Sequence, residues 1–134
     1  MSTLIYCDTN VYIDYFEDCR SGFIPLGEFS YQVFRRAIGC EFTIVVSDWL
    51  LKEVEHVGYK KEMASLLHRA KSKVVLQSLQ DTDLQVARAL PTHYADAVHA
   101  AIAISSGATC IVTNNIKDFL PLSHRIVCKT PRDM

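Results

Sequence analysis

The feature that most constrains this chain is a set of short apolar runs separated by segments with helical spacing. The runs are rich in β-branched and aromatic residues, lack clean alternation, and lie at residues 3–7, 42–46, 74–79 and 109–112. Such runs are typical of strands covered on both faces. The intervening segments predict helices at about 10–19, 29–39, 48–57, 59–71, 82–90 and 94–106, the last closed by Gly107. This order predicts an α/β fold with a central, mainly parallel sheet.

The length and composition indicate a single globular domain. A chain of 134 residues has the usual size of one domain, and 49% hydrophobic with 22% charged residues is a globular composition. We therefore expect one domain over residues 1–134, with 129–134 as a flexible tail. Turn-forming residues lie within 17–41, so we expect a loop before the second helix.

The sequence also favours a cytoplasmic protein that does not enter a membrane. No apolar run approaches the roughly 20 residues needed to span a bilayer, and the N-terminus lacks signal-peptide features. The five cysteines are odd in number and scattered, which predicts buried thiols in a reducing compartment.

The charge of the chain neither identifies nor excludes a nucleic-acid partner. The formal net charge is −1, but a local basic patch can act against a neutral background. The densest basic region comprises Lys60, Lys61, His68, Arg69, Lys71 and Lys73, with Arg35 and Arg36 elsewhere. It is either an RNA contact or a solvated helix face.

Asp8 interrupts two apolar runs at the end of the first predicted strand. In open parallel sheets, ligands bind beyond the carboxyl ends of the strands, so Asp8 is placed for chemistry. The alternative is that Asp8, Thr9 or Asn10 only caps the following helix, since all three residue types are favoured there.

A second candidate is Asp96, on a predicted helix that is apolar on nearly every side except at Asp96 and His99. A carboxylate on a buried helix needs a cation, a metal or several donors, and no lysine or arginine lies within a turn of it. A metal site is the sharper hypothesis, and an exposed first-turn aspartate is the alternative. His99 is a secondary candidate, either bonded to Asp96 or substrate or simply packed.

Two further candidates follow the second and fourth predicted strands. Leu50, Val54 and Val57 would form the core stripe of their helix, which leaves Glu53 at its margin and Glu55 on the solvent side. A solvated Glu53 is the alternative. The stretch from Thr113 through Asn115 to Asp118 again ends a strand in polar groups, although alone it has the character of a turn.

Taken together, these motifs resemble the PIN-domain ribonucleases, particularly the VapC-like toxins of bacterial toxin–antitoxin pairs. The matching pieces span residues 4–127 and lie in the expected order; they are Asp8-Thr9-Asn10, Glu53, Asp96-Ala97-Val98-His99-Ala100-Ala101, and Thr113-Asn114-Asn115 through Asp118-Phe119. The resemblance implies a PIN-like three-layer α/β/α sandwich. The segment 17–41 departs from the compact toxin pattern by an added loop and helix.

The resemblance also implies an acidic pocket that binds one or two Mg²⁺ or Mn²⁺ ions and hydrolyses RNA phosphodiester bonds with a metal-activated water. Asp8 and Asp96 would be direct ligands, whereas Glu53 and Asp118 would hold water or a second ion. Oxygen-only ligands suit such hard cations. Thr9, Asn10, Thr113, Asn115 and His99 would orient these groups or touch phosphate.

The sequence fits other protein classes less well than it fits a PIN-domain ribonuclease. A haloacid-type phosphatase needs a second aspartate where Asn10 stands, and a receiver domain needs paired acids and a late lysine that are not clear here. An RNA-processing or RNA-decay PIN nuclease without a toxin role, or a non-catalytic PIN binding module, remains an alternative. The resemblance implies an RNA substrate. Aromatic residues crowd the early helices, so we also expect an antitoxin protein and a homodimer; the alternative is that these aromatics belong to the core.

Overall fold

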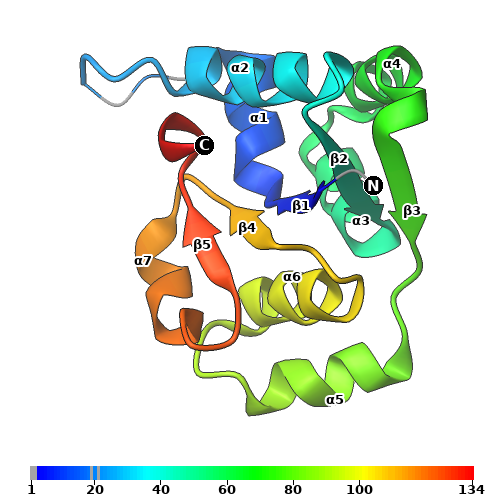
Figure 1. Cartoon of the computed structure of the whole chain (residues 1–134), viewed down its shortest axis with the longest axis vertical. Helices are drawn as coiled ribbons and strands as arrows, with labels where there is room; N and C mark the ends of the chain where they lie inside the picture. Colours follow the sequence, from blue (N-terminus) through cyan, green and yellow to red (C-terminus); the bar gives the residue numbers. More distant parts are fainter. Residues whose placement is uncertain (1–2, 19, 21) are drawn as a thin grey trace.

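The protein is built on a five-stranded, all-parallel sheet. The computed structural model describes residues 3–18, 20 and 22–134. The strands are paired in the order β3-β2-β1-β4-β5 (Figure 1). Their bounds are β1 Thr3–Cys7, β2 Phe42–Ser47, β3 Val74–Gln77, β4 Cys110–Val112 and β5 Val127–Lys129. The predicted parallel α/β architecture is confirmed, and β5 is an additional strand that the sequence pattern did not predict.

All six predicted helices are present, each within about three residues of its expected ends. They are α1 Thr9–Glu17, α2 Leu26–Ile38, α3 Asp48–Val57, α4 Lys60–Arg69, α5 Asp81–Ala89 and α6 Tyr94–Ser105. A short helix, α7 Ile116–Phe119, forms where the sequence had the character of a turn. Three single-turn 3₁₀ helices add to these: η1 Lys71–Lys73, η2 Leu120–Leu122 and η3 Pro131–Asp133.

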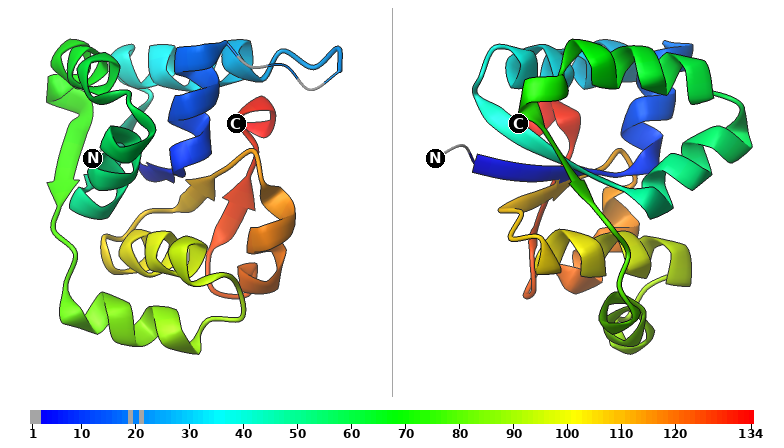
Figure 2. Two further views of the ribbon diagram at one scale, coloured as in Figure 1. Left: turned by 180° about the vertical axis from the view of Figure 1, so that it is seen from behind. Right: turned by 90° about the vertical axis from the view of Figure 1, so that its right-hand side faces the viewer.

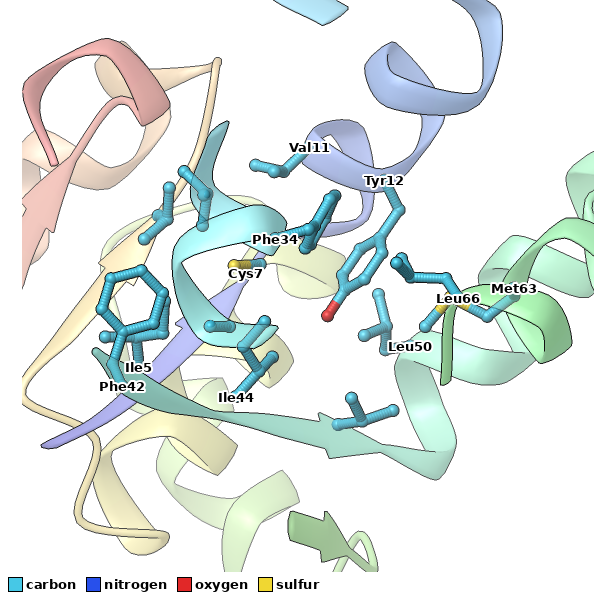
Figure 3. Close-up of a cluster of buried hydrophobic side chains, with 14 of the residues drawn as sticks. Ile5, Cys7, Val11, Tyr12, Phe34, Phe42, Ile44, Leu50, Met63 and Leu66 are labelled. Carbon is cyan, nitrogen blue, oxygen red and sulfur yellow. The ribbon is translucent and has the colours of Figure 1, made fainter. Parts of the chain in front are cut away.

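The helices cover both faces of the sheet and complete the predicted three-layer α/β/α sandwich. Alternate residues of β1 point to opposite faces, so Ile5 and Cys7 pack with residues of α1 to α4, while Tyr6 packs with α5 and α6. Figure 2 shows the two helical layers on either side of the twisted sheet. Figure 3 shows the first of these cores, where Tyr12 and Phe34 stack with ring centroids 4.9 Å apart.

Several expectations about exposure need correction. Val57 was assigned to the core stripe of α3 but is 52% exposed, because α3 turns its buried residues Leu50 and Val54 toward the sheet. Of the cysteines predicted as buried thiols, Cys7 and Cys110 are buried and Cys128 is half-buried, but Cys40 is exposed in the turn after α2. These four are free thiols, and Cys19 lies outside the described residues.

The segment expected to be a flexible tail packs on the domain instead. Lys129 ends β5 and its carbonyl accepts a hydrogen bond from the Thr113 backbone N–H at 2.9 Å. Pro131 is buried, and Met134 packs against the core between the sheet and α1 to α4. No helix among residues 3–18, 20 and 22–134 is long and apolar enough to cross a membrane.

The aromatic residues of the early helices divide between core and surface. Val11, Tyr12 and Phe34 are buried, and Tyr15, Phe16 and Phe29 are half-buried. Phe23 is fully exposed and Tyr31 is 40% exposed. The expected loop and helix within 17–41 therefore contribute to the core through α2 and leave part of their aromatic surface open.

Candidate active site

The carboxyl ends of β1 and β2 and the start of α6 border a pocket of about 740 Å³. It contains three of the four predicted acidic residues: Asp8, Glu53 and Asp96. Its full lining is Asp8, Thr9, Asn10, Ile13, Asp14, Trp49, Lys52, Glu53, His56, Val57, Asp96 and His99. Asp118 does not line this pocket, although its charge acts on Asp96. The sequence motifs thus converge at one edge of the sheet.

Asp8 caps α1 and also lines the acidic pocket. Its Oδ1 accepts from the Thr9 backbone N–H at 2.8 Å, which caps α1. Its Oδ2 accepts from the Thr113 hydroxyl at 3.0 Å and from the Asn10 amide at 3.1 Å. Burial raises the pKa of Asp8, while His99, Thr9 and Thr113 oppose the rise. These donors compensate a nearly buried carboxylate.

Glu53 reaches the same pocket from α3 and is held by two donors. The Thr9 hydroxyl donates to its Oε1 at 2.5 Å, and His99 Nε2 lies 2.5 Å from the same oxygen. Partial burial would raise the pKa of Glu53, but the hydrogen bonds and charge of His99, with the Thr9 hydrogen bond, bring it below its ordinary value. Glu53 is therefore an ionised acceptor, and Nε2 of His99 carries the proton between them.

His99 connects this pair to a buried chain of hydroxyl groups that the sequence did not predict. Its Nδ1 lies 2.6 Å from the Tyr6 hydroxyl, which lies 2.8 Å from Ser47 Oγ. Ser47 Oγ also accepts from the Leu50 backbone N–H and so caps α3. One arrangement of donors satisfies every group: Ser47 donates to Tyr6, Tyr6 donates to His99 Nδ1, and His99 Nε2 donates to Glu53. The contacts form a closed loop, because α3 carries both Ser47 at its start and Glu53 on its second turn.

Asp96 carries the clearest electrostatic signature of the site. It lies in the first turn of α6 and is half-exposed, whereas the following residues from Ala97 to Ala103 are buried. Burial and the negative charges of Asp8 and Asp118 raise its pKa from 3.8 to about 6. The acidic groups are thus close enough to disfavour each other's ionisation.

The segment after β4 holds the remaining predicted residues. The Thr113 hydroxyl contacts Asp8 and accepts from the Asn115 backbone N–H at 3.0 Å. The Asn115 side-chain amide donates to Asp118. Thr113 and Asn115 therefore each contact one of the predicted acidic residues. Two further contacts were not predicted: the Asn114 N–H donates to Asn10 Oδ1 at 3.0 Å, and its side chain donates to Asp14.

The donor set is rich in oxygen, but no group of three or more His, Cys, Asp or Glu side chains is arranged to hold a metal among the residues that the structure describes. The hydrogen bonds above explain this, since Glu53 faces His99 and Asp118 faces Asn115. Mg²⁺ requires only one or two protein carboxylates and retains its waters. Asp8 and Asp96 line the same pocket and the charge of Asp8 raises the pKa of Asp96, so the pair fits such an ion.

The raised pKa of Asp96 predicts how the stability of the metal-free protein depends on pH. An acid whose folded-state pKa exceeds its unfolded value destabilises the fold above that value, and the loss develops as pH rises from about 4 to 6. Asp96→Asn should remove this loss and raise the melting temperature at pH 7–8 by roughly 2–5 °C in chelator, because solvent screening limits the gain to on the order of 1 kcal/mol.

At about pH 3 the same substitution should have little effect, since this lies below both the unfolded value of 3.8 and the folded pKa of about 6, and Asp96 is then largely protonated in both states. Thermal unfolding of both proteins across this range provides the measurement. A stabilisation equal at both ends of the range would show that repulsion at Asp96 is not its source.

Comparison with known proteins identifies the family. A family model described as PIN domain matches residues 5–117. No match was found among curated proteins.

Two solved structures have similar folds. A chain of the VapBC2 complex from Rickettsia felis, bound to a DNA fragment from its promoter, has a TM-score of 0.67 at 18% identity, covering 96% of this chain and 98% of that one. A chain of a toxin–antitoxin complex from Klebsiella pneumoniae has a TM-score of 0.66 at 23% identity, covering 99% and 100%. With the family model extending over most of the sequence, the chain belongs to the PIN domain family.

Proposed function

We propose that the protein is a metal-dependent endoribonuclease that hydrolyses RNA phosphodiester bonds. The observation that carries this proposal is the convergence of Asp8, Glu53 and Asp96 on one pocket at the carboxyl edge of the sheet. Burial and the charges of Asp8 and Asp118 raise the pKa of Asp96 there to about 6. Glu53 extends the coupled set, because its charge also raises the pKa of Asp8. PIN domains are generally nucleases, which agrees with this chemistry.

Asp8 and Asp96 would hold a Mg²⁺ or Mn²⁺ ion, while Glu53 and Asp118 would hold its waters or a second ion. A divalent ion supplies charge neutralisation at the phosphate and lowers the pKa of an attacking water. The protein's own part is to keep the carboxylates in place before substrate arrives. Thr9, Asn10 and Thr113 fix Asp8, while His99 and Thr9 fix Glu53.

We further propose that this nuclease is the toxin of a toxin–antitoxin pair in the cytoplasm. Both solved structures described above are toxin–antitoxin complexes. The free thiols of Cys7, Cys40, Cys110 and Cys128 suit a reducing compartment. An antitoxin partner and a homodimer would cover exposed apolar surface on α2 and the turn before it, where Phe23 is fully exposed and Tyr31 is 40% exposed.

We propose a surface hollow as the binding place of the antitoxin. A hollow of about 460 Å³ is lined by Tyr15 and Phe16 of α1 and by Lys61, Glu62, Ser65 and Arg69 of α4. Its mixture of aromatic and charged groups suits an amphipathic helix or an extended tail. From there, a basic side chain such as arginine would reach the acidic pocket and compete with metal.

The nuclease proposal predicts RNA cleavage that requires a divalent ion. Structured RNA incubated with the protein should give fragments with Mg²⁺ or Mn²⁺ and none with chelator, as resolved on denaturing gels. Asp8→Asn should abolish cleavage but retain the fold, because asparagine also caps helices well. Cleavage that persists in chelator would refute the metal mechanism, and turnover retained by Asp8→Asn would remove Asp8 from the ligand set.

Helix α3 offers a matched pair of glutamates for a second test. Glu53→Gln should reduce cleavage by roughly 10–100-fold, because it weakens the charged contact with His99 that positions the site. Glu55→Gln should change cleavage little, since Glu55 only pairs with Lys60 at 3.5 Å on the exposed surface. Initial rates at saturating Mg²⁺ measure both effects. A larger loss in Glu55→Gln would exclude Glu53 from the catalytic set.

The partner proposal predicts growth arrest on expression and a dimer in solution. Expression of the wild-type chain should stop growth of its host, whereas Asp8→Asn should not. Analytical ultracentrifugation of the inactive variant should give a dimer mass. A monomer that is harmless yet cleaves RNA would contradict both the dimer and the toxin role. It would favour an RNA-processing or RNA-decay nuclease, whereas a protein that binds RNA without cleaving it would favour a binding module.

A further inference from the structure

The acidic residues occupy only part of the pocket, and the other part is a wall with different chemistry. This wall, here called the α3 wall, is formed by Trp49, Lys52, His56 and Val57 of α3 together with Ile13 of α1. None of these side chains was assigned a role by the motifs that identify the acidic centre. The predicted basic region on α4 does not line the pocket, whereas Lys52 and His56 do.

Helical geometry places the useful groups of α3 on one face. Trp49, Lys52 and His56 are spaced by three and four residues, and Glu53 lies one turn after Trp49. Leu50 and Val54 are fully buried in the sheet core, which fixes the rotation of the helix. A single rigid surface therefore presents an aromatic ring, two basic groups and a carboxylate of the acidic centre.

The Trp49 ring is held in position as a platform. It packs against the core on the α6 side of the sheet and meets the Tyr94 ring edge-on, with centroids 6.5 Å apart and an interplanar angle of 89°. Its Nε1 is buried and has no hydrogen-bond partner among the described residues. The exposed part of the indole in the pocket is thus an aromatic surface held by packing rather than a polar contact.

The size of the pocket exceeds what a phosphate and an ion require. A volume of about 740 Å³ is in the range of sites that enclose small organic ligands. Beside the acidic centre, Ile13, Val57 and Trp49 supply apolar and aromatic surface, which suits a nucleobase and its sugar. Lys52 offers a phosphate positive charge, and the His56 ring offers it a hydrogen-bond donor.

We propose that the α3 wall binds an unpaired nucleotide of RNA next to the scissile phosphate, with its base stacked on Trp49 and a flanking phosphate at Lys52 and His56. This inference rests on the proposed nuclease function and names its substrate class as single-stranded RNA. A base in a duplex is stacked between its neighbours and cannot present a face to the ring, so paired RNA is excluded.

The single tryptophan of the chain makes the proposal directly measurable, because intrinsic fluorescence reports on Trp49 alone. The Asp96→Asn variant in Mg²⁺ provides an uncleaving protein with less negative charge facing the phosphate. Titration with a mixed-sequence RNA decamer should quench its emission with a saturable curve. The same RNA annealed to its complement should quench at least about tenfold more weakly.

Substitutions in the same background test the two chemical components. Anisotropy of a labelled decamer should show that Trp49→Leu weakens binding by about tenfold, whereas Trp49→Phe retains most of it. Lys52→Ala should weaken binding several-fold and reduce its salt dependence. The matched control is Lys60→Ala, which removes an exposed lysine outside the pocket lining and should leave binding unchanged.

The outcomes separate this inference from the nuclease proposal. Absence of quenching by single-stranded RNA, equal quenching by the duplex, or quenching by single-stranded DNA but not RNA would each overturn the inference. All three measurements use the protein with Trp49 intact. They therefore test the proposal even if a Trp49 variant fails to fold. RNA cleavage by wild type without such quenching would refute the α3 wall as a nucleotide-binding surface and leave the nuclease proposal intact. Quenching without any cleavage would support the α3 wall and overturn the nuclease.

Discussion

The site depends on a closed loop of hydrogen bonds that passes through both layers of helices. Ser47 caps α3 and contacts Tyr6 of β1, Tyr6 contacts His99 of α6, and His99 returns to Glu53 of α3. All but Glu53 are buried, and leaving any one of these polar groups without its partner would cost about 1–3 kcal/mol. The register of α3 and α6 against the sheet is therefore tied to the position of one carboxylate of the acidic pocket, Glu53.

A second constraint joins this loop to the end of the sheet. Asp8 follows β1 directly, and its backbone N–H donates to the Val112 carbonyl of β4 at 2.8 Å, which extends the pairing of the two strands. Thr113 of the same β4 end then donates to the Asp8 carboxylate. Thr9 completes the connection, since its hydroxyl donates to Glu53 and lies 3.2 Å from His99 Nε2. The carboxylates are held by neutral donors, which keeps their negative charge available.

The sequence could predict the structural elements that depend on patterns of neighbouring residues. The run 3–7 has the bounds of β1, and the acidic residues lie near one edge because parallel strands place their carboxyl ends together. Strand β5 has only three residues and offers no pattern to recognise. Tyr6 has the character of a core residue, and its polar partners lie 41 and 93 residues away, so their meeting depends on the tertiary fold. Likewise, periodicity cannot show that α3 ends with Val57 outside the core.

The same limit explains why the α3 wall is invisible in the sequence and distinct in the structure. Trp49 and Lys52 belong to an ordinary amphipathic helix, where an aromatic residue at the margin and an exposed lysine carry no signal. Their position becomes specific only because Leu50 and Val54 are buried and Ser47 fixes the first turn. Rotating α3 by one residue, about 100°, would turn Glu53 away from His99 and Trp49 away from the pocket together. The contacts that fix the rotation of α3 therefore determine the positions of both the acidic centre and the α3 wall.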